Sequence, residues 1–117
     1  MSAPLRTRKV NMDLANRKCV PCESGTPKLG AERIRELLGQ VRGWEAKDDR
    51  LHKSFMFKDF VTAMEFLNRV AEVAESEQHH PDFAVHYNRV DFTIWTHTVG
   101  GLSENDFVLA AKIDTLV

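Results

Sequence analysis

Four of the five histidines of this chain lie between positions 79 and 97, and three of these four carry the clearest chemical signal in the sequence. His79 and His80 are adjacent, Pro81 follows them directly, and His97 completes the group. Histidine is the side chain whose ordinary pKa lies nearest to neutrality, so it suits proton transfer at physiological pH. We interpret the group as a functional site rather than as scattered surface residues.

The backbone separates the two adjacent histidines. Pro81 disfavours the helical region for His80 and makes it extended, and the side chains of extended neighbours point to opposite sides. His79 and His80 are therefore poorly placed to hold one ion together. Three interpretations stay open from spacing alone: acid–base catalysis or ligand binding, a structural role, and a zinc site formed by Glu75, His79 and His97.

Four further side chains are candidates for the same site, and each has a plainer alternative. Glu75 shares a helix face with His79 if the helix extends that far, or it is an exposed residue at a helix end. Tyr87 either stacks on a planar ligand or packs against the protein. Trp95 forms either a pocket wall or a subunit contact. Asp106 is favoured as a helix N-terminal group over a catalytic one.

The composition is that of one ordinary globular domain. The chain has 117 residues, of which 43% are hydrophobic and 28% are charged, and its net charge is -1. This balance gives no overall attraction to nucleic acid or to a membrane surface, and no apolar run approaches the length of a transmembrane helix. The first residues lack the apolar core of a signal peptide, so we expect a cytoplasmic protein.

Residues 1–28 are predicted to form a polar, partly mobile N-terminal arm, ahead of a single domain over residues 29–117. The arm is either a solvated tail or a basic contact segment. It contains Cys19 and Cys22, whose Cys-x-x-Cys spacing is either structural or incidental, or serves a metal or redox role. Prolines and a glycine around the pair indicate a loop.

Apolar residues recur either at the helical spacing or at every second position, and these patterns mark three helices and four strands. The helices are expected at 31–39, 59–75 and 107–116, and the strands at 43–46, 51–57, 83–87 and 90–97. The order is helix, two strands, long helix, two strands, helix. It predicts an α+β fold: a four-stranded antiparallel sheet with helices packed on one face.

Strand 90–97 has the most regular alternation. One set of side chains, which includes Ile94 and Thr96, is predicted to face the helices, whereas Trp95 and His97 face the other side. A hairpin between the last two strands brings His97 towards the other histidines. Further on, Ser103 with an aspartate three residues later resembles a helix N-cap pair and predicts the start of the last helix.

Taken together, the candidate residues form one pattern. In chain order it is Glu75-x-x-x-His79-His80-Pro81, then Tyr87, His97 and Asp106. This pattern resembles the signature of the pterin-4a-carbinolamine dehydratases. The resemblance covers about residues 29–115 and leaves out the arm with the two cysteines.

The resemblance implies loss of water from a 4a-hydroxytetrahydropterin to give the quinonoid dihydropterin, with no metal or organic cofactor. Hydroxide is a poor leaving group, so a general acid must protonate the 4a-oxygen while a base removes the proton from ring nitrogen N5. By the same resemblance, His79 and His97 are the acid–base pair. His80 binds and orients the pterin, and Glu75 supports the histidines.

Tyr87, Trp95 and Asn105 are predicted to contact the substrate beside His80. Members of this family often carry an arginine at the position of Asn105. An asparagine is neutral and cannot make the same charged contact. We therefore expect this difference to affect substrate affinity or preference more than the chemistry.

The resemblance also implies partners. Family members form dimers through their sheets, and some form tetramers through helices; Phe66 and Val73 give helix 59–75 a broad apolar surface that fits such contacts. An aromatic amino-acid hydroxylase is expected in the same pathway, and no nucleic acid or membrane contact is implied. The alternative function is a non-catalytic binding module, since relatives of this fold act as dimerisation partners of a transcription factor or assist protein assembly.

Overall fold

The computed structural model of this chain describes residues 14–21 and 25–117. Cys22 and residues 1–13 of the predicted arm lie outside the described residues. Within the part of the arm that is described, Leu14 is buried in the core and Ala15 packs against it. Residues 14–21 are therefore in contact with the domain that follows them.

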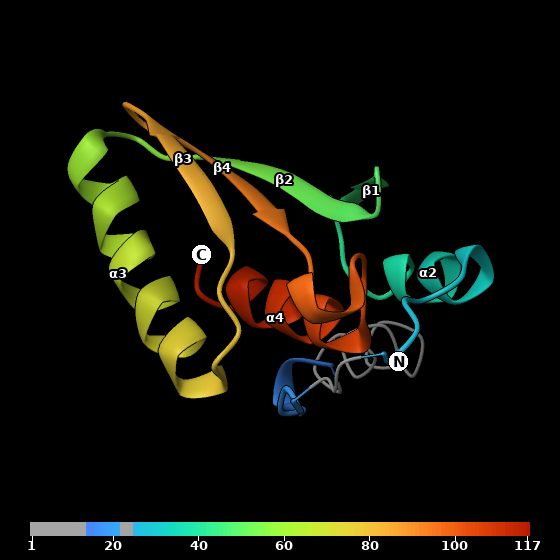
Figure 1. Cartoon of the computed structure of the whole chain (residues 1–117). Coiled ribbons are helices and arrows are strands. Elements are labelled where there is room, and N and C mark those ends of the chain that lie inside the picture. Colours follow the sequence, from blue (N-terminus) through green and yellow to red (C-terminus); the bar gives the residue numbers. More distant parts are fainter. Residues whose placement is uncertain (1–13, 22–24) are drawn as a thin grey trace, which may run out of the picture.

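The sheet has four antiparallel strands (Figure 1), namely β1 (Glu45–Lys47), β2 (Arg50–Met56), β3 (Asp82–His86) and β4 (Arg89–Ile94). Their order is β1-β2-β4-β3, so β2 and β4 form the central pair. In that pair Leu51 lies opposite Ile94, and Phe55 lies opposite Val90. Residues opposite each other share a face, so this register places the apolar residues of both strands on the same side.

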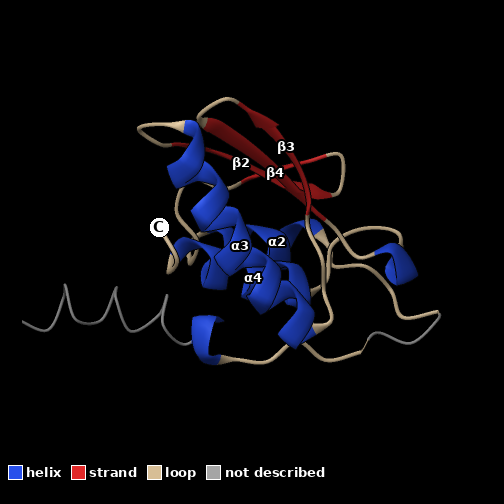
Figure 2. Ribbon diagram, turned by 90° about the vertical axis from the view of Figure 1, so that its left-hand side faces the viewer, coloured by secondary structure: helices blue, strands red, loops and turns tan. Residues whose placement is uncertain are grey.

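Three helices cover one face of the sheet, and the described residues leave the other face uncovered (Figure 2). They are α2 (Ala31–Leu38), α3 (Phe60–Glu77) and α4 (Glu104–Asp114), and a short 3-10 turn, η1 (His97–Val99), precedes α4. The predicted α+β architecture and its order of elements are confirmed. Among the described residues, no helix is long and apolar enough to span a membrane.

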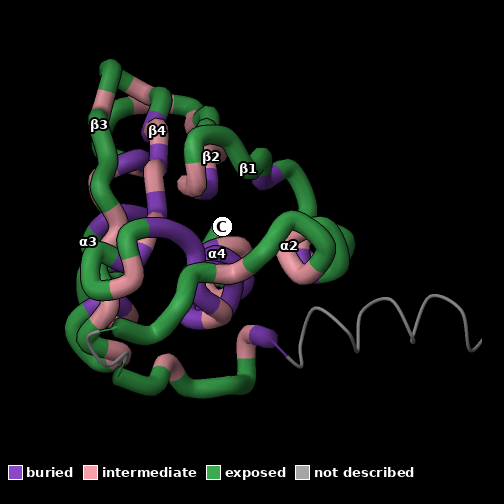
Figure 3. Tube along the Cα trace, turned by 45° about the vertical axis from the view of Figure 1, so that its right-hand side comes forward, coloured by how far each residue is buried: buried purple, intermediate pink, exposed green. Residues whose placement is uncertain are grey.

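Aromatic rings fill the space between the sheet and α3. Phe66 is fully buried, and its ring centroid lies 5.2 Å from that of Phe55 and 6.0 Å from that of Phe92. The expectation that Phe66 widens an outward surface for a partner helix is therefore wrong, because the ring points into the core. Figure 3 shows that α4 is also largely buried. This packing fixes where the ends of α3 and α4 lie.

Strand β4 ends at Ile94, three residues before the alternation predicts. The Thr96 backbone N–H donates to the Gly101 carbonyl oxygen at 2.8 Å, which closes a tight loop. Gly100 turns this loop with a φ of 71°, a conformation that glycine adopts easily. His97 therefore begins a turn instead of continuing the strand, although Ile94 and Thr96 are buried as predicted.

Candidate functional site

A contact between His79 and Asp106 forms the centre of the candidate site. His79 Nε2 lies 2.6 Å from Asp106 Oδ1, and the two side chains are 12% and 0% exposed. A carboxylate only accepts hydrogen bonds, so we assign the proton to Nε2 of the histidine. By this assignment Nδ1 of His79 is the nitrogen that can accept a proton from a ligand.

The C-terminal end of α3 directs His79 towards this carboxylate. Gln78 adopts a left-handed φ of 54° and donates its backbone N–H to the Glu75 carbonyl oxygen. The His79 N–H donates to the Ala74 carbonyl oxygen at 3.2 Å. These bonds form a Schellman motif, which turns the chain away from the helix axis. Since α3 ends before His79, Glu75 and His79 do not share a helix face.

The second oxygen of Asp106 stabilises the fold. Asp106 Oδ2 accepts a hydrogen bond from the Ser103 backbone N–H at 2.8 Å and another from the Thr96 hydroxyl at 2.9 Å. The first bond belongs to a capping box at the start of α4. The prediction of Asp106 as a helix N-terminal group is confirmed, but it missed the contact with His79. The place of Asp106 in the family pattern was the signal for that contact.

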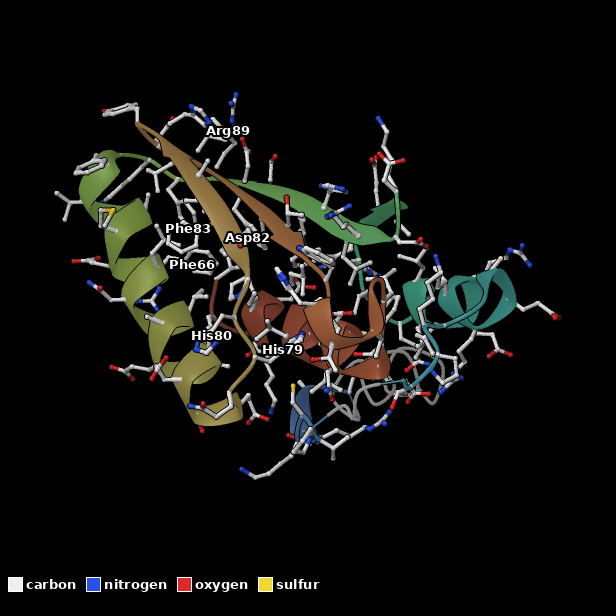
Figure 4. All side chains as sticks on the ribbon, in the orientation of Figure 1. Phe66, His79, His80, Asp82, Phe83 and Arg89 are labelled. Atoms are coloured by element: carbon white, nitrogen blue, oxygen red, sulfur yellow. The ribbon has the colours of Figure 1, made fainter. Side chains whose placement is uncertain are left out.

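His80 faces the opposite way and pairs with Glu75. His80 Nε2 lies 2.7 Å from Glu75 Oε2, and the two side chains are 53% and 72% exposed. Figure 4 shows His80 beside α3 and His79 directed towards α4. The predicted divergence of the two histidines is confirmed, and Glu75 supports His80 rather than His79.

His97 lies at the surface beside Trp95. Their rings stack with centroids 3.8 Å apart and an angle of 30° between the planes. The Arg50 guanidinium carbon lies 4.2 Å from the centroid of the same indole, a cation–π distance. His97 directly follows Thr96, whose hydroxyl donates to Asp106. The backbone of His97 therefore adjoins the carboxylate network.

A cavity of about 490 Å³ opens beside His79. The described residues that line it are Cys19, Val20, Pro21, Ser76, Glu77, Gln78, His79, Thr96, Thr98 and Asn105. Of the predicted site residues, His79 and Asn105 belong to this lining, and His97 lies in the chain between two of its members. The volume falls in the ordinary range for small-molecule sites.

Two predicted substrate contacts occupy less expected positions. Asn105 is only 6% exposed, and its side chain is hydrogen-bonded to the backbone of Val20. Tyr87 is 66% exposed in the turn between β3 and β4. β3 leads away from His80, and its five residues span about 16 Å when extended. Within one chain, Tyr87 therefore lies at the far end of β3 from the histidines.

The zinc alternative lacks the geometry that it needs. Glu75, His79 and His97 contact three different partners instead of one common point. Among residues 14–21 and 25–117, no three histidine, cysteine, aspartate or glutamate side chains are grouped so that they could hold a metal ion.

Glu104, next to the site, links the N-terminal segment, α2 and α4. Its Oε1 lies 2.9 Å from Arg17 Nη2, and its Oε2 lies 3.0 Å from Arg33 Nη2. The hydrogen bond from Arg17, followed by that from Arg33, lowers the pKa of Glu104 below its ordinary value. The charged form of Glu104 is therefore favoured in the folded protein.

The fold and the site together define a small α+β protein in which a histidine–carboxylate pair, at the end of the long helix, faces a cavity. The family model of pterin 4 alpha carbinolamine dehydratase matches residues 27–116 of this sequence. The chain belongs to this family.

Individual relatives are similar over most of their length. A Nitrosomonas eutropha protein, provisionally named as a pterin-4-alpha-carbinolamine dehydratase, is 51% identical over 108 residues, which cover 90% of this chain and 94% of the relative. A crystal structure from Brucella melitensis, described as a transcriptional coactivator/pterin dehydratase, is 37% identical with a TM-score of 0.74, covering 76% of this chain and 97% of that one. A pterin dehydratase-like RuBisCO assembly factor of the alpha-carboxysome is 26% identical with a TM-score of 0.54, covering 65% and 87%.

Proposed function

We propose that this protein dehydrates 4a-hydroxytetrahydropterins to quinonoid dihydropterins by histidine acid–base catalysis. The observation that carries the proposal is the contact between His79 and Asp106, in which a buried carboxylate orients a histidine at the wall of a cavity. Family membership supports the kind of reaction. Orientation of a catalytic imidazole by a buried carboxylate is a recurrent arrangement in enzymes.

The proposed reaction breaks two bonds of the substrate. A general acid protonates the 4a-oxygen, which leaves as water, and a general base takes the N5 proton. The electron pair of the N5–H bond then forms the C4a=N5 double bond of the quinonoid product. His79 and His97 are the proposed pair. One gives a proton to the departing 4a-oxygen and the other takes the N5 proton, so the enzyme ends with no net change in its number of protons.

The neighbouring side chains have supporting roles in this proposal. His80, held by Glu75 at the surface, binds and orients the pterin. Trp95 holds the ring of His97 by stacking, beside its predicted contact with the substrate. For Tyr87, contact with the substrate stays a prediction, since its position in the chain adds no support.

Stopped-flow absorbance with freshly generated 4a-hydroxytetrahydropterin tests the proposal. We expect His79→Gln and His97→Gln each to lower kcat about 10²-fold or more, the ordinary contribution of a positioned acid or base. His86→Gln is the matched control, because His86 is an exposed histidine on β3, and its activity should stay within about twofold of wild type. Wild-type protein that is no faster than buffer would overturn the proposal.

We also propose a biological setting for this activity. The product is the oxidised form of a tetrahydropterin cofactor, which a separate two-electron reduction would restore, so the protein would supply one step in recycling the cofactor of an aromatic amino-acid hydroxylase in the cytoplasm. We propose that it works there as a homo-oligomer, either a dimer or a tetramer.

A non-catalytic binding role is the second candidate. It is favoured by the descriptions of two solved relatives as a transcriptional coactivator and as a RuBisCO assembly factor. Large apolar side chains such as Phe60 and Val61 are also exposed on this chain, as a binding surface requires. The same variants separate the two functions: His79→Gln and His97→Gln would strongly slow dehydration but leave binding to a protein partner unchanged.

A further inference from the structure

The cavity beside His79 has one wall that the proposed mechanism does not use. Cys19, Val20 and Pro21 all line this cavity, although they precede the region that matches the family model. The backbone of this segment is hydrogen-bonded to the domain, whereas Val20 as a residue is 64% exposed. An apolar side chain at the edge of a cavity offers surface that a bound ring can cover.

Asn105 clasps this segment by its side-chain amide. The Val20 N–H donates to Asn105 Oδ1 at 2.9 Å, and Asn105 Nδ2 donates to the Val20 carbonyl oxygen. One side chain thus satisfies both backbone groups of a single residue. Asn105 is 6% exposed and lies in the first turn of α4, directly before Asp106. The clasp therefore ties the position of the segment to the helix that holds the His79 partner.

Independent bonds fix the segment on its other side. The Cys19 N–H donates to Glu77 Oε1 at 2.8 Å, and the Glu77 side chain is 7% exposed in the last turn of α3. Lys112 of α4 donates to the Ala15 carbonyl oxygen at 2.6 Å and lies 3.8 Å from Glu77 Oε2. The segment is therefore bonded to both helices whose ends form the site.

We propose that Cys19–Pro21 is a fixed wall of the substrate cavity, and that Asn105 is the positioning residue that holds this wall and thereby restricts which 6-substituted pterins fit. The inference rests on the proposed function. It gives Asn105 a role through Val20 in place of the direct substrate contact that the sequence predicts. Because side chains of α3 and α4 hold the backbone of this wall by hydrogen bonds, its position does not depend on the identity of the substrate.

Amide hydrogen exchange followed by NMR tests the wall without catalysis. The probe is 7,8-dihydrobiopterin, a stable tautomer of the quinonoid product. In wild-type protein we expect this pterin to slow exchange at Val20, because it covers the segment. In Asn105→Ala the Val20 amide should exchange about fivefold faster, since one hydrogen bond of roughly 1 kcal/mol is lost, while the Cys19 amide, bonded to Glu77, should change less. Exchange at Val20 that is unaffected by bound pterin would overturn the proposal.

Kinetics with two substrates test the selectivity. The 4a-hydroxy forms of 6-methyltetrahydropterin and tetrahydrobiopterin differ in the size of the C6 substituent. We expect Asn105→Ala to change the ratio of their KM values about fivefold, or roughly 1 kcal/mol, and to leave kcat within about twofold. Val20→Gly enlarges the cavity without touching the clasp or the core, so it should shift the ratio in the same direction. Lys18→Ala, an exposed change one residue outside the wall, is the control and should shift nothing.

The outcomes separate this inference from the proposed function. If wild-type protein does not dehydrate the substrate but dihydrobiopterin protects its Val20 amide, the catalytic proposal is overturned and the wall proposal stands. If wild-type protein is active and the KM ratio is unchanged in both Asn105→Ala and Val20→Gly, the wall proposal is overturned and the catalytic proposal stands. A rise in kcat/KM for both substrates in these variants would show that the segment obstructs the cavity, which also overturns its role as a wall.

Discussion

Asp106 divides its two oxygens between the proposed catalytic histidine and the fold. One oxygen faces His79, and the other accepts from Ser103 and Thr96. A fully buried carboxylate is costly unless its oxygens are well bonded, and here three donors surround it. The orientation of the proposed catalytic histidine therefore depends on the same group that begins α4.

Asp106→Asn is expected to lower kcat about 10²-fold or more while the protein remains folded. The new amide must keep its oxygen towards the Ser103 N–H, so it turns its NH₂ group towards His79. Nε2 of His79 then has to accept a hydrogen bond, which reverses the tautomer. Stopped-flow kinetics and urea unfolding measure the two effects.

Thr96→Val is the matched control for this substitution. It removes one donor to Asp106 but leaves the contact with His79 in place. We expect it to lower the free energy of unfolding by about 1–2 kcal/mol with a much smaller effect on kcat. Equal kinetic losses in Asp106→Asn and Thr96→Val would argue against tautomer control.

The stack of Trp95 on His97 leads to a prediction that separates two roles of the indole. If Trp95 orients His97, Trp95→Leu should lower kcat about tenfold and leave KM nearly unchanged. If Trp95 instead contacts the substrate, as the sequence predicts, KM should rise at constant kcat. Thr93→Ala, two residues earlier on the same face of β4, controls for general loss of sheet packing.

The N-terminal segment and α4 are joined by a charge pair that depends on pH. The folded-state pKa of Glu104 is lowered by Arg17 and Arg33, so the charged form stabilises the fold above the ordinary glutamate pKa of 4.5. This stabilisation is lost as the pH falls through the lower folded-state pKa. Because Glu104 is about one-third exposed, solvent screening keeps its size below about 1 kcal/mol.

Glu104→Gln should therefore be less stable than wild type at pH 7 and equally stable in strong acid. Urea unfolding at a series of pH values measures this difference. Glu36→Gln is the control, because Glu36 pairs with Arg33 on the exposed surface of α2 and is more strongly screened. A difference between Glu104→Gln and wild type that does not change with pH would contradict the assignment.

Sequence patterns predict some of these elements much better than others. Alternation along β2 and β4 and the apolar periodicity of α3 arise from burial, which leaves a repeating trace in the sequence. The contact between His79 and Asp106 leaves no such trace, because it joins residues 27 positions apart that only the tertiary fold brings together. The docking of Cys19–Pro21 was also missed, since its bonds use backbone groups that every residue has.

The whole molecule has an apolar region at the end opposite the cavity. Met56, Phe60, Val61 and Tyr87 are all exposed there, at the junction between β2 and α3 and in the β3–β4 turn. Backbone bonding of Phe57 to Asn88 holds these two loops side by side. Exposed apolar groups that lie together mark interaction surfaces more often than chance. This apolar region is therefore consistent with the predicted homo-oligomer.

Light scattering should give a mass that is a multiple of the 13.4 kDa chain. We expect Val61→Lys to shift the protein towards the monomer, because it places a charge on the apolar region. Thr26→Lys adds the same charge to an exposed loop elsewhere and should leave the mass unchanged. A monomeric wild-type protein at micromolar concentration would rule out the oligomer.

The double use of Asp106 also has an evolutionary consequence. Loss of His79 or His97 would remove the proposed chemistry, whereas loss of Asp106 would also weaken the start of α4 and the loop before it. Descendants of such a protein that changed from enzyme to scaffold could therefore discard their histidines and still be selected to keep the aspartate. In lineages of this fold that only bind partners, we expect the aspartate to be conserved more often than the histidines, because the start of α4 still needs its carboxylate.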